Sequence, residues 1–176
     1  MKTLIPPVIA FTLASLFAHA QDFPFGAISG NEFTMKRYER DTGASAVVLK
    51  EFGYAFISDA DYHLRFKYHV RIKVLNKNGL DRGNIEVALR RERSDRAERI
   101  EEIRASSFAL ENGQVREERV DSRNIFIEDH DKYKQIEKFA IPNVRVGSII
   151  ELALFPNLLG LPCLTAAAGS CLTPGI

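Results

Sequence analysis

Eleven residues in the middle of the chain alternate without a break between apolar and polar side chains. From Leu64 to Val74 the sequence reads LRFKYHVRIKV, with apolar residues at the even positions and basic residues or His at the odd ones. Successive side chains of a strand point to opposite faces, so this pattern predicts a long strand with one buried and one solvated face. Asn76 to Gly79 supplies a turn after it, and a shorter strand with alternating apolar residues follows at 85–89.

Short strand-like runs fill most of the remaining sequence. Residues 46–59 are typical of a hairpin or a bent strand broken near Phe52-Gly53, and residues 98–120 of a hairpin around Asn112-Gly113. Further short strands are expected at 124–129, 135–142 and 147–154. One early helix is predicted, capped by Asn31, with Glu32 in its first turn and Gly43 just past its end. Without a βαβ rhythm, these elements predict a mostly β fold: an antiparallel sandwich or curved sheet with one short N-terminal helix.

The first twenty residues have the layout of a secretory signal peptide. Lys2 precedes a short apolar run, and Ala18-His19-Ala20 is a cleavage signal that would leave Gln21 as the new N-terminus. The run is shorter than the about 20 apolar residues of a comfortable membrane span; an uncleaved anchor or a buried helix is the alternative. The protein is therefore expected to be exported to the periplasm or cell envelope. Without the signal peptide, which contains Lys2, the chain has 23 basic and 23 acidic residues. Its formal net charge is therefore zero, and no overall positive charge would attract nucleic acid.

No charged residue follows Glu151, although charged residues are frequent before it. We therefore expect a lead at 21–30, a β-rich domain at 31–152 and an atypical neutral tail at 153–176. Prolines and glycines weaken the interpretation of the tail as a membrane anchor. Two other interpretations of the tail remain: a neutral natural terminus, and a loss of the reading frame near 152–155. The composition break favours the loss of the reading frame. Cys163 and Cys171 could form a disulfide in an oxidising compartment, but carry no meaning if the frame is lost.

Five basic or His residues occupy the polar face of the long predicted strand: Arg65, Lys67, His69, Arg71 and Lys73. Such a row could bind an anionic polymer or a carboxylate ligand. Alternatively, it is a solvated face paired with carboxylates such as Glu86, Glu101 or Glu117. The balanced net charge favours the paired interpretation.

Signals for catalysis or metal binding are weak. His63 and His69 would lie about 20 Å apart along one strand, too far to share a metal, and the acidic run Glu128 to Asp131 fits no calcium-loop spacing. Motifs of nucleophilic hydrolases and zinc proteases are absent from the sequence. We therefore predict no catalytic residues, no cofactor and no metal.

Several segments together resemble a known family, most specifically HVRIKVLNKNG at 69–79 and IPNVRVGSIIE at 141–151. From about Asn31 to Leu152 the chain is similar to the exported bacterial domain of unknown function that precedes transglutaminase-like domains. The resemblance implies a β-rich, non-catalytic module whose partner is a transglutaminase-like catalytic domain or an envelope peptide or polymer. The partner domain's Cys-His-Asp set has no counterpart here, and the departure from the family pattern near Glu151 implies a truncated product. A stand-alone hydrolase using carboxylates and a membrane-attached envelope scaffold are the alternative functions.

Overall fold

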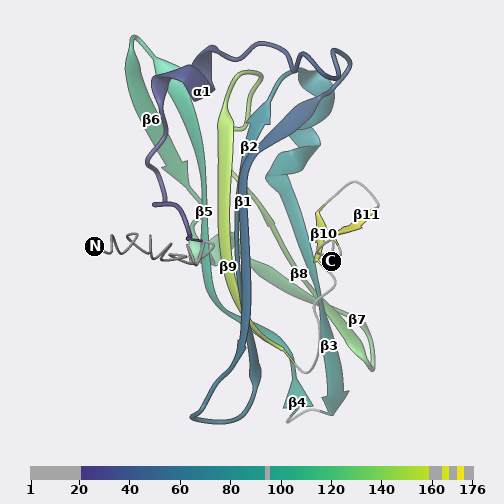
Figure 1. The fold of residues 1–176 in the computed structure, drawn as a ribbon. Helices are drawn as coiled ribbons and strands as arrows, with labels where there is room; N and C mark the ends of the chain where they lie inside the picture. Colours follow the sequence, from purple (N-terminus) through teal and green to yellow (C-terminus); the bar gives the residue numbers. More distant parts are fainter. Residues whose placement is uncertain (1–20, 94–95, 159–163, 167–169, 173–176) are drawn as a thin grey trace, which may run out of the picture.

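The computed structural model describes residues 21–93, 96–158, 164–166 and 170–172 (Figure 1). Within them the fold is mostly β, with two antiparallel sheets, which confirms the predicted fold class. The elements, in chain order, are α1 (Gly30–Thr34), β1 (Ala46–Ile57), β2 (Leu64–Val74), the 3₁₀ helix η1 (Lys77–Gly83), β3 (Asn84–Arg93), β4 (Arg96–Ala97), β5 (Arg99–Glu111), β6 (Gln114–Arg119), the 3₁₀ helix η2 (Ser122–Asn124), β7 (Phe126–Asp131), β8 (Lys134–Ala140), β9 (Ile149–Leu158), β10 (Leu164–Ala166) and β11 (Ser170–Leu172).

The two sheets contain strands that are distant in sequence. The first sheet has the order β1-β2-β9-β5-β6, and the second has the order β11-β10-β3-β8-β7, with β4 beside β3. The long alternating strand β2 lies between β1 and β9, so it is paired on both sides (Figure 1). None of the helices in the described residues is long and apolar enough to cross a membrane.

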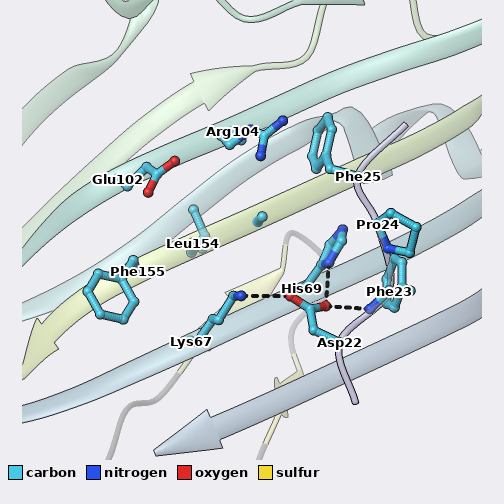
Figure 2. A pocket seen from close by; sticks show the side chains of 11 residues that line it. Asp22, Phe23, Pro24, Phe25, Lys67, His69, Glu102, Arg104, Leu154 and Phe155 are labelled. Carbon is cyan, nitrogen blue, oxygen red and sulfur yellow. Dashed lines mark hydrogen bonds and ion pairs between the residues drawn. The ribbon is translucent and has the colours of Figure 1, made fainter. Parts of the chain in front are cut away.

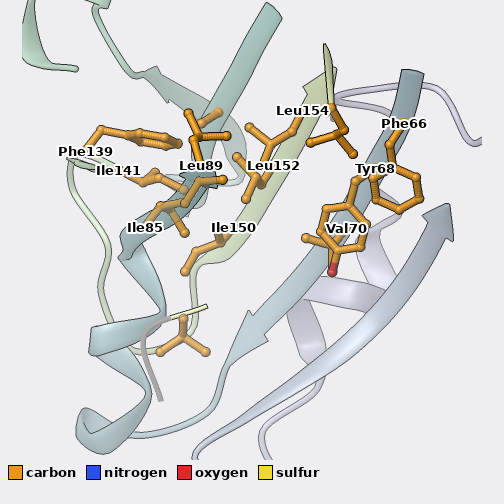
Figure 3. Packing of buried hydrophobic residues seen from close by; sticks show 14 residues of the cluster. Phe66, Tyr68, Val70, Ile85, Leu89, Phe139, Ile141, Ile150, Leu152 and Leu154 are labelled. Carbon is orange, nitrogen blue, oxygen red and sulfur yellow. The ribbon is translucent and has the colours of Figure 1, made fainter. Parts of the chain in front are cut away.

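The hydrophobic core lies between the sheets (Figure 3). The apolar face of β2 contributes Phe66, Tyr68 and Val70, and β9 contributes Leu152 and Leu154. The second sheet supplies the opposing residues Ile85, Val87, Leu89 and Phe139. The alternation of β2 therefore predicted its core face correctly. Burial of these aliphatic and aromatic side chains is the main favourable term for the fold.

The strand predictions differ from the structure at β1. The predicted hairpin or break near Phe52-Gly53 is wrong, because β1 is one continuous strand whose register shifts only between Val48 and Lys50. Gly53 pairs with Tyr68, and a Cβ at this position would lie 3.4 Å from the Phe66 ring. The glycine thus permits close packing against an aromatic side chain instead of a turn.

The predicted hairpin around Asn112-Gly113 is confirmed. β5 and β6 pair up to Glu111 and Gln114, and both turn residues have positive φ angles, 52° for Asn112 and 79° for Gly113. This is the conformation of a two-residue type I′ turn, which suits the twist of the flanking strands.

The predicted early helix is much shorter than expected. α1 ends at Thr34, so the prediction that it continues to near Gly43 is wrong, and Asn31 lies inside the helix instead of capping it. Ser29 is the capping residue, and its backbone N–H donates to Glu32 at 2.6 Å. Contacts of this segment with β2, described below, fix it as a short turn on the sheet.

The expected boundary at Leu152 does not coincide with the end of a strand. β9 continues to Leu158 and pairs with β2 on one side and β5 on the other. Leu154 and Leu158 are each 3 % exposed. Leu152, Leu154 and Leu158 belong to the core cluster, so burial accounts for the apolar side chains on the core face of β9 as far as Leu158. The expected signal peptide and Cys163 lie outside the described residues, as do the side chain of Cys171 and most of the tail; the disulfide and the reading-frame hypothesis stay predictions.

Candidate functional site: a pocket beside a buried charge network

The segment from Asp22 to Thr34, here called the strap, crosses the outer face of the first sheet (Figure 1). Its backbone contacts charged side chains of β2 and β9. The N–H of Gly26 donates to Glu151 at 3.1 Å, and the carbonyl of Ala27 accepts from Arg71 at 2.9 Å. The strap therefore covers the polar side of β2 and β9.

Under the strap, His69 lies between two carboxylates. Its Nδ1 is 2.8 Å from Asp22, and its Nε2 is 2.9 Å from Glu151. Arg71 contacts Glu151 at 3.1 Å and Glu32 at 3.2 Å. The side chains of Arg71 and Glu151 are both 0 % exposed. Burying charges in this way is tolerated only when they are paired and hydrogen-bonded.

The protonation states in this network follow from the contacts. Burial disfavours the charged form of Asp22, but hydrogen bonds from Lys67 and His69 outweigh it and lower its pKa. Burial likewise opposes ionisation of Glu32, and hydrogen bonds from the Ser29 backbone and from Arg71 still lower the Glu32 pKa.

Lys73 completes the buried row in a different way, by contacting carbonyl groups. Its Nζ donates to the carbonyls of Phe33 at 3.0 Å and Gly147 at 2.6 Å. Burial lowers the pKa of Lys73. The carbonyl dipoles replace water around the ammonium, and the contact with Phe33 anchors the end of the strap.

The predicted solvated stripe on β2 is therefore wrong for His69, Arg71 and Lys73, which are at most 2 % exposed. The physical reason is the strap, which replaces solvent over this half of the strand. Arg65 is also mostly covered and contacts Asp61 and Glu101. Only the Lys67 side chain stays about half exposed, and it forms an ion pair with Asp22 at 2.8 Å.

Among the carboxylates suggested as partners of the stripe, only Glu101 contacts it, through Arg65 at 3.4 Å. Glu86 lies 3.8 Å from Lys138 on the second sheet. Glu117 pairs with Arg119 and accepts from Ser106. The paired interpretation was correct in kind, but the main partners, Asp22, Glu32 and Glu151, come from the strap and from β9.

A pocket of about 450 Å³ opens where the strap begins, next to this network (Figure 2). Its floor is β9, with Ala153 paired to both His69 and Arg104. Lys67 and His69 lie on one side of the floor, and Glu102 and Arg104 lie on the other. The small side chain of Ala153 leaves space between its larger neighbours, which explains the hollow at this point.

Aromatic rings line both ends of the pocket. Phe23 stacks on His69 with ring centroids 3.8 Å apart, and Arg104 lies 4.5 Å from the Phe25 ring centroid. Phe155 lines the opposite end (Figure 2). The pocket thus combines apolar rings with charges of both signs, a combination common in small-molecule sites.

The sequence analysis missed Asp22, Glu102 and Arg104 as site residues. The signals available were the apolar Phe23-Pro24-Phe25 run directly after an acidic residue and the alternation at the start of β5. The acidic run at Glu128 to Asp131 forms exposed ion pairs instead, with Glu128 2.7 Å from Lys138. No group of three potential metal ligands was found among the described residues.

Comparison with known proteins gave no match: no protein-family profile, curated protein or solved structure is significantly similar to the chain. The resemblance to the domain that precedes transglutaminase-like domains therefore stays a prediction. The function has to be argued from the pocket and the strap.

Proposed function

We propose that this protein is a non-catalytic binding module of an exported transglutaminase-like protein, and that it binds a peptide or peptide-bearing polymer of the cell envelope in the pocket beside the strap. The observation that carries the proposal is the composition of the pocket. Its walls are aromatic and charged, and no hydroxyl or thiol side chain is among the described residues that line it. Such walls supply stacking surface and ion pairing but no Ser, Thr or Cys nucleophile.

The environment of His69 supports binding over catalysis. A catalytic base must offer a free nitrogen within hydrogen-bond reach of a substrate proton. Both ring nitrogens of His69 already contact carboxylates, and Phe23 covers the ring face. His69 therefore supports the strap and the pocket wall and has no free position for proton transfer.

One observation favours a second candidate, a stand-alone periplasmic hydrolase. Asp22 and Glu102 both line the pocket, and most glycoside hydrolases use a pair of carboxyl groups that flank the scissile bond. The hydrogen bonds to Asp22 lower its pKa, which suits a base or nucleophile better than an acid. In this alternative, Glu102 would be the general acid.

A sedimentation experiment tests the binding role. Purified protein is mixed with insoluble, peptide-bearing cell-wall polymer, the pellet is assayed for protein, and the supernatant is assayed for released fragments. We expect the protein in the pellet and no release of fragments. Phe155→Ala should reduce pelleting, whereas Tyr133→Ala, at an exposed position in the turn between β7 and β8, should not.

Release of fragments that is lost in Glu102→Gln would establish the hydrolase alternative. Failure to bind the polymer, or equal binding by Phe155→Ala, would contradict the proposed site. Cell fractionation addresses the envelope-scaffold alternative: a soluble module is found in the periplasmic fraction, whereas a membrane-attached scaffold resists washing with salt and carbonate.

A further inference from the structure

Glu102 and Arg104 are the charged residues of the pocket that the strap network does not neutralise. Asp22 already contacts Lys67 and His69. Within the described part of the chain, Glu102 makes no hydrogen bond or ion pair, and the guanidinium of Arg104 makes only the contact with the Phe25 ring at short range. The pocket therefore presents one unpaired negative group and one positive group without a hydrogen-bonded partner.

The strand that carries these two residues sets the spacing of their backbone positions. They are two residues apart on β5, both on the outer face, since Arg104 pairs with Ala153 and Glu102 with Phe155. Two residues of a strand span about 6.6–6.8 Å. An extended dipeptide spans about 6.6–7.2 Å from end to end. The charged ends of an extended dipeptide are therefore about as far apart as the two backbone positions that carry Glu102 and Arg104.

From this match we propose that the pocket binds the free ends of a dipeptide-sized zwitterion, with its ammonium at Glu102 and its carboxylate at Arg104. The inference rests on the proposed binding role of the pocket and names the ligand class. The ligand's apolar side chain lies over Ala153 and packs against Phe155 or Phe25, which line the pocket (Figure 2). The volume of about 450 Å³ is within the range of small-molecule sites.

The two opposite charges also define what the pocket rejects. A simple anion is attracted by Arg104 but repelled by the neighbouring Glu102. A simple cation is attracted by Glu102 but repelled by Arg104. Only a ligand with both charges at the right separation satisfies both groups. Blocking either end of the dipeptide removes one ion pair, and for partly exposed pairs we expect each block to weaken binding about fivefold.

The test is a titration of the purified protein with alanyl-phenylalanine, followed by calorimetry and by NMR shifts of the β5 amides. The same dipeptide with an acetylated N-terminus and with an amidated C-terminus provides the comparison. We expect the free dipeptide to bind most tightly. Glu102→Gln should abolish the preference for a free amine only, and Arg104→Gln the preference for a free carboxylate only. Arg99→Gln, an exposed change on the same strand, should alter neither preference.

Equal affinity for free and blocked dipeptides would overturn the inference, as would a free-amine preference that survives Glu102→Gln. Tighter binding of an acidic glycan than of the dipeptide, unaffected by Glu102→Gln, would also overturn it. If the dipeptide fails to bind while polymer still sediments in a Phe155-dependent way, the zwitterion inference fails and the proposed function stands. If the dipeptide binds as expected but the polymer does not sediment the protein, the zwitterion inference stands and the proposed binding of the polymer fails. Glu102 and Arg104 are exposed, so the variants should fold, and their thermal unfolding midpoints verify this.

Discussion

Replacement of Glu151 by Gln is the sharpest test of the buried charge network. The Glu151 side chain is 0 % exposed and accepts from His69 at 2.9 Å, Arg71 at 3.1 Å and the Gly26 N–H at 3.1 Å. Glu151→Gln keeps the size of the side chain but removes its charge. It also places an amide donor where the neighbours are already donors.

The expected cost follows from what remains after the change. The positive charge of Arg71 stays buried beside His69, and only Asp22 and Glu32 of the strap still contact these two side chains. Removing one partner of a buried ion pair typically lowers the free energy of unfolding by about 3–5 kcal/mol. This is a large fraction of the about 5–15 kcal/mol that stabilises a domain, so we expect a partly unfolded protein or a detached strap.

Urea unfolding monitored by circular dichroism measures the effect, with Glu102→Gln as the matched control. Glu102 lies on the same face of the first sheet but is exposed and makes no ion pair among the described residues, so its replacement should change stability by less than about 0.5 kcal/mol. Arg71→Met in the Glu151→Gln background should cost less than Arg71→Met alone, because contacting residues are coupled. A loss below about 1 kcal/mol for Glu151→Gln would refute the reasoning that this network stabilises the fold.

Three further predictions concern the strap, the close packing of η1 and the end of β9. Because the folded-state pKa values of Asp22 and Glu32 lie below their ordinary values of 3.8 and 4.5, their stabilisation is complete above those ordinary values and is lost as the pH falls through the lowered ones; the urea midpoint should therefore fall less between pH 6 and pH 3 in an Asp22→Asn, Glu32→Gln double variant than in the native protein. Gly79→Ala should destabilise by about 1–3 kcal/mol, since its Cβ would lie 2.3 Å from the Ser45 carbonyl oxygen, whereas Gly30, with nothing within 4 Å, is the control in the same assay. Leu154→Ala should cost about 2–5 kcal/mol if residues after Leu152 belong to the core, and a loss under 1 kcal/mol would contradict that placement.

The sequence allowed prediction of those parts of the fold that depend on local pattern. β2 begins and ends where its alternation does, and the Asn112-Gly113 turn needed only the positive φ angles that these residue types accept. Ile85, Val87 and Leu89 of β3 face the core as expected. The mistaken break at Gly53 has a clear cause, because a glycine in a strand has the same sequence signature whether it turns the chain or accommodates a ring.

The candidate site depends on pairings that no local pattern contains. Alternation assigns residues to two faces of a strand but does not say what covers each face. His69 is held by Asp22, 47 positions earlier in the chain, and by Glu151, 82 positions later. A basic residue facing solvent and one buried against a distant carboxylate look the same in the sequence, so the burial of this row could not be predicted.

The same reasoning changes the meaning of the loss of charge after Glu151. A composition break at that point suggested a foreign tail, because charged residues are frequent between Gln21 and Glu151. In the structure, Glu151 lies on a central strand, where its carboxylate contacts His69 and Arg71. The residues from Leu152 to Leu158 lie between β2 and β5 and mostly beneath other side chains. Charges at the core-facing positions Leu152, Leu154 and Leu158 would each require a buried partner of this kind, so burial explains why these positions are apolar.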